Sequence, residues 1–220
     1  MKIGYTHIIV LLDRSGSMDK IKNDMIGGFN TFLQEQKDVP GDCTTTLVQF
    51  NDKYEVIYRF KSLSEAPRLT DSLFKPSGTT NLITSSIKLI DEEGIELSKM
   101  DESQRPEKVI FMSITDGEHN TNKLDGISYE NTNYNLKEKI QHQENIYKWQ
   151  FVYLGANQDA YASGDIYGVS KMKSMNFGAN SRGIETVYKN ISSATRRYRT
   201  SATSDFAFTD LEQKESDETV

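Results

Sequence analysis

An aspartate and two serines stand on alternate residues early in the chain, in the segment Asp13-Arg14-Ser15-Gly16-Ser17. This segment offers one carboxylate and two hydroxyls, and the glycine between the serines permits a tight turn. Oxygen-only ligands suit hard divalent cations such as Mg²⁺, Mn²⁺ or Ca²⁺. Hydroxyls coordinate such an ion without neutralising it, so the ion keeps an affinity for an anionic ligand from outside. The pattern therefore predicts a cation site suited to binding.

Two later segments carry residues of the same chemical kind. Residues 76–82 have the sequence PSGTTNL, and the apolar run 109–114 is followed by Thr115, Asp116 and Gly117. Serine, aspartate and glycine are also common in ordinary turns and helix caps, so the first segment alone would be equally well explained as a cap. The two additional segments favour the metal site.

The elements around these segments indicate how they could meet. Residues 8–12 form a short, continuous apolar run that predicts a buried strand, and residues 18–33 repeat apolar side chains at helical spacing. A second helix is predicted from Leu82, and a second buried strand over 109–114. Because ligands of open α/β sheets bind at the carboxyl ends of the strands, Asp13 and Asp116 are expected at one edge.

At this point the chain resembles the von Willebrand factor type A (vWA) family over roughly residues 5–200. The metal-ion-dependent adhesion site (MIDAS) of that family uses Asp-x-Ser-x-Ser, a threonine in a Gly-Thr loop and an aspartate followed by glycine, in this order. The resemblance assigns the first motif to Asp13, Ser15 and Ser17. Thr80 matches the second motif because GTTNL aligns with the family's GGTNL, and Asp116 matches the third.

The resemblance implies a Mg²⁺ ion, with Mn²⁺ or Ca²⁺ as alternatives, held by Asp13, Ser15, Ser17, Thr80 and Asp116. It also implies that an aspartate or glutamate of a partner protein completes the coordination. Thr79 replaces the family's second glycine, so the choice between Thr79 and Thr80 stays open. One ion is expected, since Lys20 and Ile21 stand where relatives of the integrin β type carry further aspartates.

The remaining pattern predicts the fold class. Further strands are expected over 44–50, 55–60, 149–154 and 171–177. Further helices are expected over 136–147 and from Asn180 or Ser181 to the basic run 196–199. The prediction is a Rossmann-like, doubly wound α/β fold. Its mostly parallel six-stranded sheet has one antiparallel edge strand and helices on both faces. Residues 1–200 form this domain, and the acidic residues 201–220 are expected to be a disordered tail.

Composition excludes some partners. The 220-residue chain is 36% hydrophobic with a mean hydropathy of -0.61, a net charge of -6 and a pI near 5.2. An acidic chain argues against broad nucleic-acid binding. A single cysteine, Cys43, forms no intrachain disulfide and favours a reducing compartment. No signal-like or bilayer-length apolar run is present. We therefore expect a cytoplasmic monomer.

Four other features carry weaker predictions. His7 is expected to be a hydrogen-bonded residue at a sheet edge rather than a ligand, and Gly27-Gly28 to mark a close approach of a neighbouring strand. Asp159 is better explained as a helix-start residue than as a metal ligand. The basic run Arg196-Arg197-Tyr198-Arg199 could contact nucleic acid, but cations are independently favourable at a helix C-terminus.

Two functions of different classes fit these residues. One is a metal-dependent protein-binding module. The other is a metal-dependent hydrolase acting on phosphate groups, with Glu118 and His119 as base and acid. Phosphotransferases of the haloacid dehalogenase class need a carboxylate two positions after the first aspartate, where this chain has Ser15. The sequence also lacks a P-loop and a Gly-x-Gly-x-x-Gly turn, which argues against nucleotide binding. The binding module is the preferred interpretation.

Overall fold

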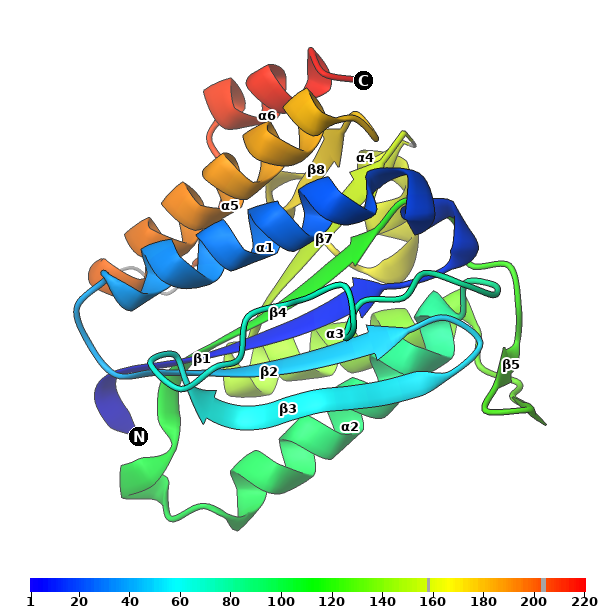
Figure 1. The fold of residues 1–220 in the computed structure, drawn as a ribbon. Coiled ribbons are helices and arrows are strands. Elements are labelled where there is room, and N and C mark those ends of the chain that lie inside the picture. Colours follow the sequence, from blue (N-terminus) through cyan, green and yellow to red (C-terminus); the bar gives the residue numbers. More distant parts are fainter. Residues whose placement is uncertain (158, 203–204) are drawn as a thin grey trace.

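Six strands form the central sheet, in the order β3-β2-β1-β4-β7-β8 (Figure 1). The structure is a computed structural model that describes residues 1–157, 159–202 and 205–220. The strands are β1 (Lys2–Asp13), β2 (Cys43–Phe50), β3 (Tyr54–Ser62), β4 (Pro106–Thr115), β7 (Gln150–Ala156) and β8 (Ser174–Phe177). Only β3 runs antiparallel, paired with β2 at one edge. The predicted fold class is confirmed.

Helices cover both faces of the sheet (Figure 1). On one face lie α1 (Lys22–Lys37), which follows a short 3-10 helix over Gly16–Ile21, and α5 (Ser181–Thr200). The other face is covered by α2 (Leu82–Lys99), α3 (Asn133–Tyr147) and α4 (Ala160–Tyr167). The side chains of β1 alternate between the two cores, Ile8 and Val10 facing one and Ile9 and Leu11 the other. Burial on both faces explains the continuous apolar run of this strand.

The two helices of the first face pack closely at Gly28. A Cβ atom at this position would lie 2.1 Å from the ring of Tyr188 in α5. The prediction of a close approach at the Gly27-Gly28 pair is therefore right, but the neighbour is a helix and not a strand. Only glycine lets the tyrosine ring sit against the backbone of α1.

The C-terminal segment is part of the folded domain. Phe206 and Phe208 are buried in the same core as α1 and α5. The helix α6 (Asp210–Asp217) begins with a capping box between Thr209 and Glu212. The Gln213 side chain donates to the backbone carbonyls of residues 171 and 174 and so covers the edge strand β8. The prediction of a disordered tail is wrong for residues 205–220, because two buried aromatic residues and a cap offset the polar composition.

Three smaller predictions concern His7, the strand over 171–177 and Asp159. His7 is hydrogen-bonded as expected, but β1 is a central strand and the imidazole is fully buried, so it is not at an edge. The strand predicted over 171–177 begins only at Ser174, after a 3-10 turn over Lys171–Lys173. Asp159 caps α4, accepting from the backbone N–H of Ala162, as predicted.

The basic run at the end of α5 has internal partners. Arg197 makes two hydrogen bonds to the Glu212 carboxylate, at 2.6 and 2.8 Å. Arg199 is buried and donates to the backbone carbonyls of Gln36, Val39 and Gly41. These two guanidinium groups therefore hold helices and a loop together. Within the described residues, no helix combines the length and apolar character that crossing a bilayer requires.

Candidate metal-binding site

Asp13 is the last residue of β1, and both of its carboxylate oxygens are held in place. The backbone N–H of Ser15 donates to Oδ1 at 2.6 Å, and the Thr115 hydroxyl donates to Oδ2, also at 2.6 Å. The carboxylate is fully buried at the carboxyl end of the parallel strands. Since Thr115 ends the neighbouring strand β4, the sheet itself fixes the orientation of Asp13.

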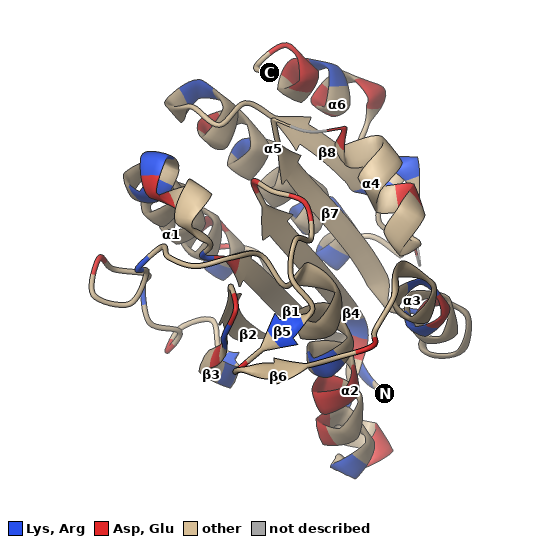
Figure 2. Ribbon diagram, turned by 90° about the vertical axis from the view of Figure 1, so that its right-hand side faces the viewer, with Lys and Arg blue, Asp and Glu red and all other residues tan. Residues whose placement is uncertain are grey.

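The first and third predicted motifs meet through their side chains. The Ser17 hydroxyl donates to Oδ1 of Asp116 at 2.6 Å, although the two residues lie far apart in the chain. The hydroxyls of Ser15 and Ser17 are 3.1 Å apart. Figure 2 views the end of the sheet at which these loops gather. Two carboxylates and two hydroxyls are therefore clustered at one point of the sheet edge.

The second motif is held against the first by backbone hydrogen bonds. Gly16 N–H donates to the carbonyl of Gly78 at 3.1 Å, and Ser77 N–H donates to the carbonyl of Arg14 at 2.8 Å. Thr79 is exposed, whereas Thr80 is buried, with its Oγ1 3.6 Å from the point where a Cβ atom of Gly117 would lie. Thr80, and not Thr79, therefore points its hydroxyl toward the loop that carries Asp116.

A residue that sequence reasoning missed holds Thr80 in place. The side-chain oxygen of Asn120 accepts from the Thr80 N–H at 2.8 Å, and the Asn120 N–H donates to the Thr80 carbonyl at 3.0 Å. Asn120 follows Asp116 in the same loop, so it ties the second motif to the third. The sequence signal was weak, since this loop contains several other asparagines and threonines.

The same loop contains a small hairpin. The strands β5 (Lys123–Leu124) and β6 (Ile127–Ser128) pair around a turn in which Asp125 and Gly126 both have positive φ. The Lys123 carbonyl accepts from the Asn81 side chain, and Asp125 N–H donates to the Asp52 carbonyl. The hairpin therefore docks against the loops beside the site.

The histidine that could have served as a catalytic acid has a structural role. Nδ1 of His119 accepts from the backbone N–H of Ile83 at 3.3 Å, near the start of α2. Nε2 must then carry the proton, and it donates to the side-chain oxygen of Asn122 at 2.9 Å. Because both ring nitrogens are used, this geometry does not favour the hydrolase interpretation. Glu118 is exposed beside it.

The two carboxylates of the site have no positive partner. Burial raises the pKa of Asp13 to about 7, with a further small increase from the charge of Asp116. Burial also raises the pKa of Asp116. Among the described residues, no lysine or arginine forms an ion pair with either carboxylate, and the adjacent Arg14 pairs with Glu55 instead. The ionised site is therefore short of positive charge, and a bound cation would supply it.

The residues present fit a hard divalent ion. The five predicted side chains offer only oxygen donors, the chemistry that Mg²⁺ and Ca²⁺ prefer. The buried Thr80 hydroxyl makes no hydrogen bond within the described part of the chain, so its lone pairs are available. No group of three or more His, Cys, Asp or Glu that could hold a metal ion occurs among the described residues. Hydroxyls are thus indispensable to any metal site here.

Solved structures resemble the fold of this chain, whereas comparisons of its sequence find no match. No protein-family model matches the chain, and no curated protein does. Among solved structures, it is similar to the vWF domain of the type V pili tip protein Mfa5 from Porphyromonas gingivalis. The TM-score is 0.64 at 8% identity, covering 90% of this chain and 97% of that one. It is also similar to VWA2, an ArnB paralog from Sulfolobus acidocaldarius, with a TM-score of 0.53 at 17% identity over 86% of this chain.

A third similar structure contains a metal. Proximal thread matrix protein 1 (PTMP1) from the mussel byssus, described with a zinc-occupied MIDAS motif, matches with a TM-score of 0.57 at 12% identity over 88% of this chain. The present chain spans less than half the length of the last two proteins, 44% of VWA2 and 46% of PTMP1. At these identities the likeness shows that the chain has the fold of a vWA domain.

Proposed function

We propose that this chain, which has the vWA fold, is a metal-dependent protein-binding module. A Mg²⁺ ion, with Mn²⁺ or Ca²⁺ as alternatives, is held by Asp13, Ser15, Ser17, Thr80 and Asp116. The observation that carries the proposal is the buried Asp13 carboxylate, which is clustered with the Asp116 carboxylate and the hydroxyls of Ser15 and Ser17 and has no ion-pair partner among the described residues. The metal-occupied site of PTMP1 supports the same type of chemistry in this fold.

The partner is expected to offer an acidic side chain. Three of the five proposed ligands are neutral hydroxyls, and burial raises the pKa of both carboxylates, so the protein ligands do not fully neutralise a divalent ion and it attracts an external anion. An aspartate or glutamate of a partner protein is the natural anion of this kind. Arg14, next to Asp13, does not compete for that carboxylate, since it is already paired with Glu55.

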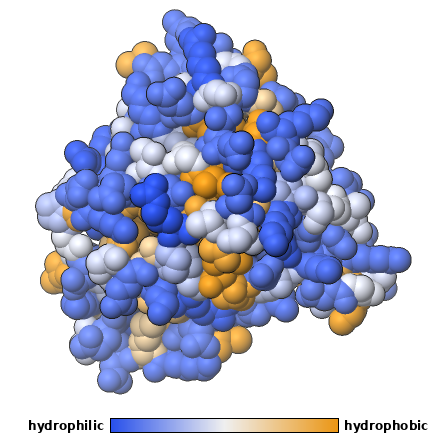
Figure 3. Space-filling view, viewed as in Figure 1, coloured by the Kyte–Doolittle hydropathy of each residue, from blue (hydrophilic) through white to orange (hydrophobic). Residues whose placement is uncertain are grey.

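The surroundings of the site agree with a protein partner. Lysine and arginine are interspersed with aspartate and glutamate over the elements in Figure 2, without the basic stripe that nucleic acid requires. Figure 3 shows a different face, the one drawn in Figure 1, and this face is also largely hydrophilic, with apolar residues in small groups. Cys43 is a free thiol, which is in keeping with a reducing compartment such as the cytoplasm.

Titration calorimetry with Mg²⁺ and Mn²⁺ tests the metal site. Asp13→Ala is expected to abolish binding while circular dichroism shows a folded domain. Asp19→Ala is the matched control. Asp19 is exposed in the 3-10 helix after the first motif, and its replacement removes the same charge near the site. Equal affinity in the wild type and Asp13→Ala would refute the assignment.

A pull-down with and without EDTA tests partner capture. A protein retained only when divalent ions are present, released by free acetate or an aspartate-containing peptide, and not retained by Asp13→Ala would support the proposal. A phosphatase screen on the same preparations separates the alternatives. Metal-dependent turnover that is lost when Glu118 or His119 is replaced would favour the hydrolase.

A further inference from the structure

A chain of polar contacts runs through the interior at the other end of β1. The Tyr5 hydroxyl lies 2.7 Å from the Thr44 hydroxyl, which lies 2.8 Å from Nδ1 of His7. Nε2 of His7 is 3.0 Å from Oε2 of Glu93, and the other oxygen of Glu93 forms a 2.9 Å ion pair with Arg59. The five residues come from four separate elements, β1, β2, β3 and α2.

The chemistry of the partners fixes the direction of each hydrogen bond. The Glu93 carboxylate, ionised beside Arg59, can only accept, so Nε2 of His7 must carry the proton. Nδ1 is then an acceptor, and the Thr44 hydroxyl must donate to it. The remaining hydroxyl, that of Tyr5, must donate to Thr44. The result is a hydroxyl–imidazole–carboxylate arrangement in which His7 is poised to take a proton from Thr44.

The surrounding structure holds the imidazole rigidly. The rings of His7 and Phe60 are stacked, with centroids 4.1 Å apart and an 11° angle between their planes. Phe60 has a φ of 49°, a conformation that is strained for an aromatic residue, and the Thr46 hydroxyl accepts from its N–H. Strain of this kind is typical of functional sites, where the surroundings impose a geometry on the chain.

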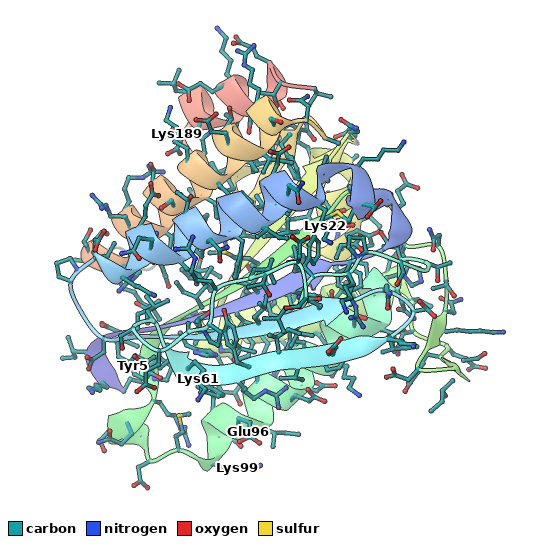
Figure 4. All side chains as sticks on the ribbon, in the orientation of Figure 1. Tyr5, Lys22, Lys61, Glu96, Lys99 and Lys189 are labelled. Atoms are coloured by element: carbon teal, nitrogen blue, oxygen red, sulfur yellow. The ribbon has the colours of Figure 1, made fainter. Side chains whose placement is uncertain are left out.

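The arrangement opens into a cavity beside the N-terminal end of β1. Its volume is about 660 Å³, within the range of small-molecule sites, and Tyr5, Thr44 and Phe60 line it. Tyr5 lies at the end of the sheet opposite to the β5 hairpin and the loops of the metal site (Figures 1 and 4). His7 and Glu93 are fully buried behind Thr44, which is partly exposed.

The lining of the cavity is positively charged. It contains three cationic side chains and a single carboxylate: Lys2, Lys37 and Arg199 against Asp42. Lys2 is paired with Asp42 at 2.6 Å. Arg199 donates only to neutral carbonyls, and its buried Nε has no partner within the described residues. The cavity therefore favours an organic anion over a neutral or cationic ligand.

We propose that this cavity is an acyl-transfer site that hydrolyses small anionic esters, with Thr44 as the nucleophile. Thr44 Oγ1 forms a bond to the ester carbonyl carbon while its proton passes to Nδ1 of His7. The carbon–oxygen bond to the alcohol breaks, and the alcohol leaves with that proton. A water molecule then attacks the acyl-threonine, gives a proton to His7, and releases the acid as Thr44 regains its proton.

The other members have distinct roles in this scheme. Glu93 is a positioning residue that fixes the tautomer of His7 and stabilises the imidazolium formed in each step. Once Thr44 Oγ1 is bonded to carbon, the Tyr5 hydroxyl is free to donate to the oxygen that develops negative charge. None of these residues belongs to the metal site, so the proposal is independent of the proposed function.

Hydrolysis of mono-4-nitrophenyl succinate in the presence of EDTA tests the proposal. The wild type is expected to release nitrophenol faster than buffer, and Thr44→Ser to retain this activity. Thr44→Val, nearly the same in shape, is expected to fall to the buffer rate. His7→Gln should lose roughly a hundredfold or more, the usual contribution of a general base. Glu93→Gln should lower kcat with little change in KM.

A covalent readout completes the experiment. A fluorophosphonate is expected to label the wild type, with the added mass on the peptide that contains Thr44, and to leave Thr44→Val unlabelled. Melting temperatures within a few degrees of wild type confirm that Thr44→Val is folded. A wild type no faster than buffer, equal turnover by Thr44→Val, or a label on any other residue would overturn the proposal.

Discussion

The strand β1 carries two fully buried polar residues, His7 and Asp13, and their surroundings differ in one respect. His7 contacts Glu93, which forms an ion pair with Arg59, and Glu92 beside it pairs with both Arg59 and Lys88. Asp13 accepts two hydrogen bonds but lies near Asp116, and no lysine or arginine among the described residues forms an ion pair with either carboxylate. The first cluster is electrically complete without a ligand. The second becomes complete only when a cation is added, which is why we assign metal binding to it.

The difference has a consequence for folding. Desolvating a charge costs several kcal/mol unless a partner compensates it, so the Asp13 cluster opposes folding whenever its carboxylates are ionised. The Glu93 cluster depends on every one of its members, because each removal leaves an uncompensated group in the interior. The loss of a carboxylate should therefore lower the free energy of unfolding strongly in the Glu93 cluster and much less, or not at all, in the Asp13 cluster.

The largest effect is expected from Glu93→Ala. Removing this carboxylate leaves the buried His7 without its partner and leaves Arg59 with Glu92 alone, and it should cost about 3–5 kcal/mol of the free energy of unfolding. Asp13→Ala in metal-free buffer should cost far less, or stabilise the fold. Urea denaturation in EDTA measures both. Glu96→Ala, which breaks a surface pair with Lys99 on the same helix, is the control and should have little effect on the free energy of unfolding. A comparable loss in Glu93→Ala and Asp13→Ala would remove the distinction.

The pH dependence of stability should reveal Asp13. Its pKa is raised from 3.8 to about 7 in the folded state, so between these values the folded protein holds a proton that the unfolded chain has released. This contribution to stability is fully present below pH 3.8 and is lost as the pH rises through 7. A shift of this size corresponds to roughly 4 kcal/mol at most.

Denaturation at pH 5 and pH 8 tests this dependence. Metal-free wild type should lose stability toward pH 8, and Asp13→Asn should lose much less. Added Mg²⁺ should restore stability at pH 8 in the wild type alone, because the ion replaces the proton. A wild type with the same pH profile as Asp13→Asn would contradict the raised pKa.

The two clusters also differ in how far sequence could predict them. Asp13, Ser15 and Ser17 are close in sequence, and Thr80 and Asp116 each stand in a recognisable turn after or before a regular element. Local pattern was therefore enough to expect Asp13 and Asp116 at one edge, whereas the choice of Thr80 came from the family resemblance. The His7 cluster draws single residues from four elements, and nothing near His7 in sequence marks Glu93 or Arg59 as its partners. Only the pairing of strands and the packing of α2 bring them together.

The C-terminal segment shows a different limit. Its acidic composition outweighed two aromatic residues, Phe206 and Phe208, although the Thr209-x-x-Glu212 pattern is a readable helix-start signal. The Glu212 carboxylate then pairs with Arg197, which explains part of the basic run at the same time. Average composition failed here because a few specific contacts decide whether a short segment folds against a domain.

A smaller effect is expected from Asn120, which holds Thr80 without contacting the ion. Asn120→Ala should lower Mg²⁺ affinity about tenfold to a hundredfold, the usual range for residues that orient a metal ligand. Calorimetry measures the affinity, and Asn133→Ala, at an exposed position at the start of α3, should leave it unchanged. If Asn120→Ala binds as the wild type does, Thr80 either needs no support or is not a ligand.

The smallest effect is expected from Lys20, a lysine whose charge influences Asp116. It forms no ion pair with that carboxylate, but its charge lowers the pKa of Asp116 against the larger effect of burial. Lys20 also repels a bound cation, so Lys20→Ala should raise Mg²⁺ affinity about twofold to threefold at low ionic strength, the size expected of an exposed charge. This gain should vanish in about 0.5 M salt because screening suppresses the interaction between exposed charges. Lower affinity in Lys20→Ala would mean that its ammonium group helps to hold Asp116 in place, so that the site has a positive partner after all.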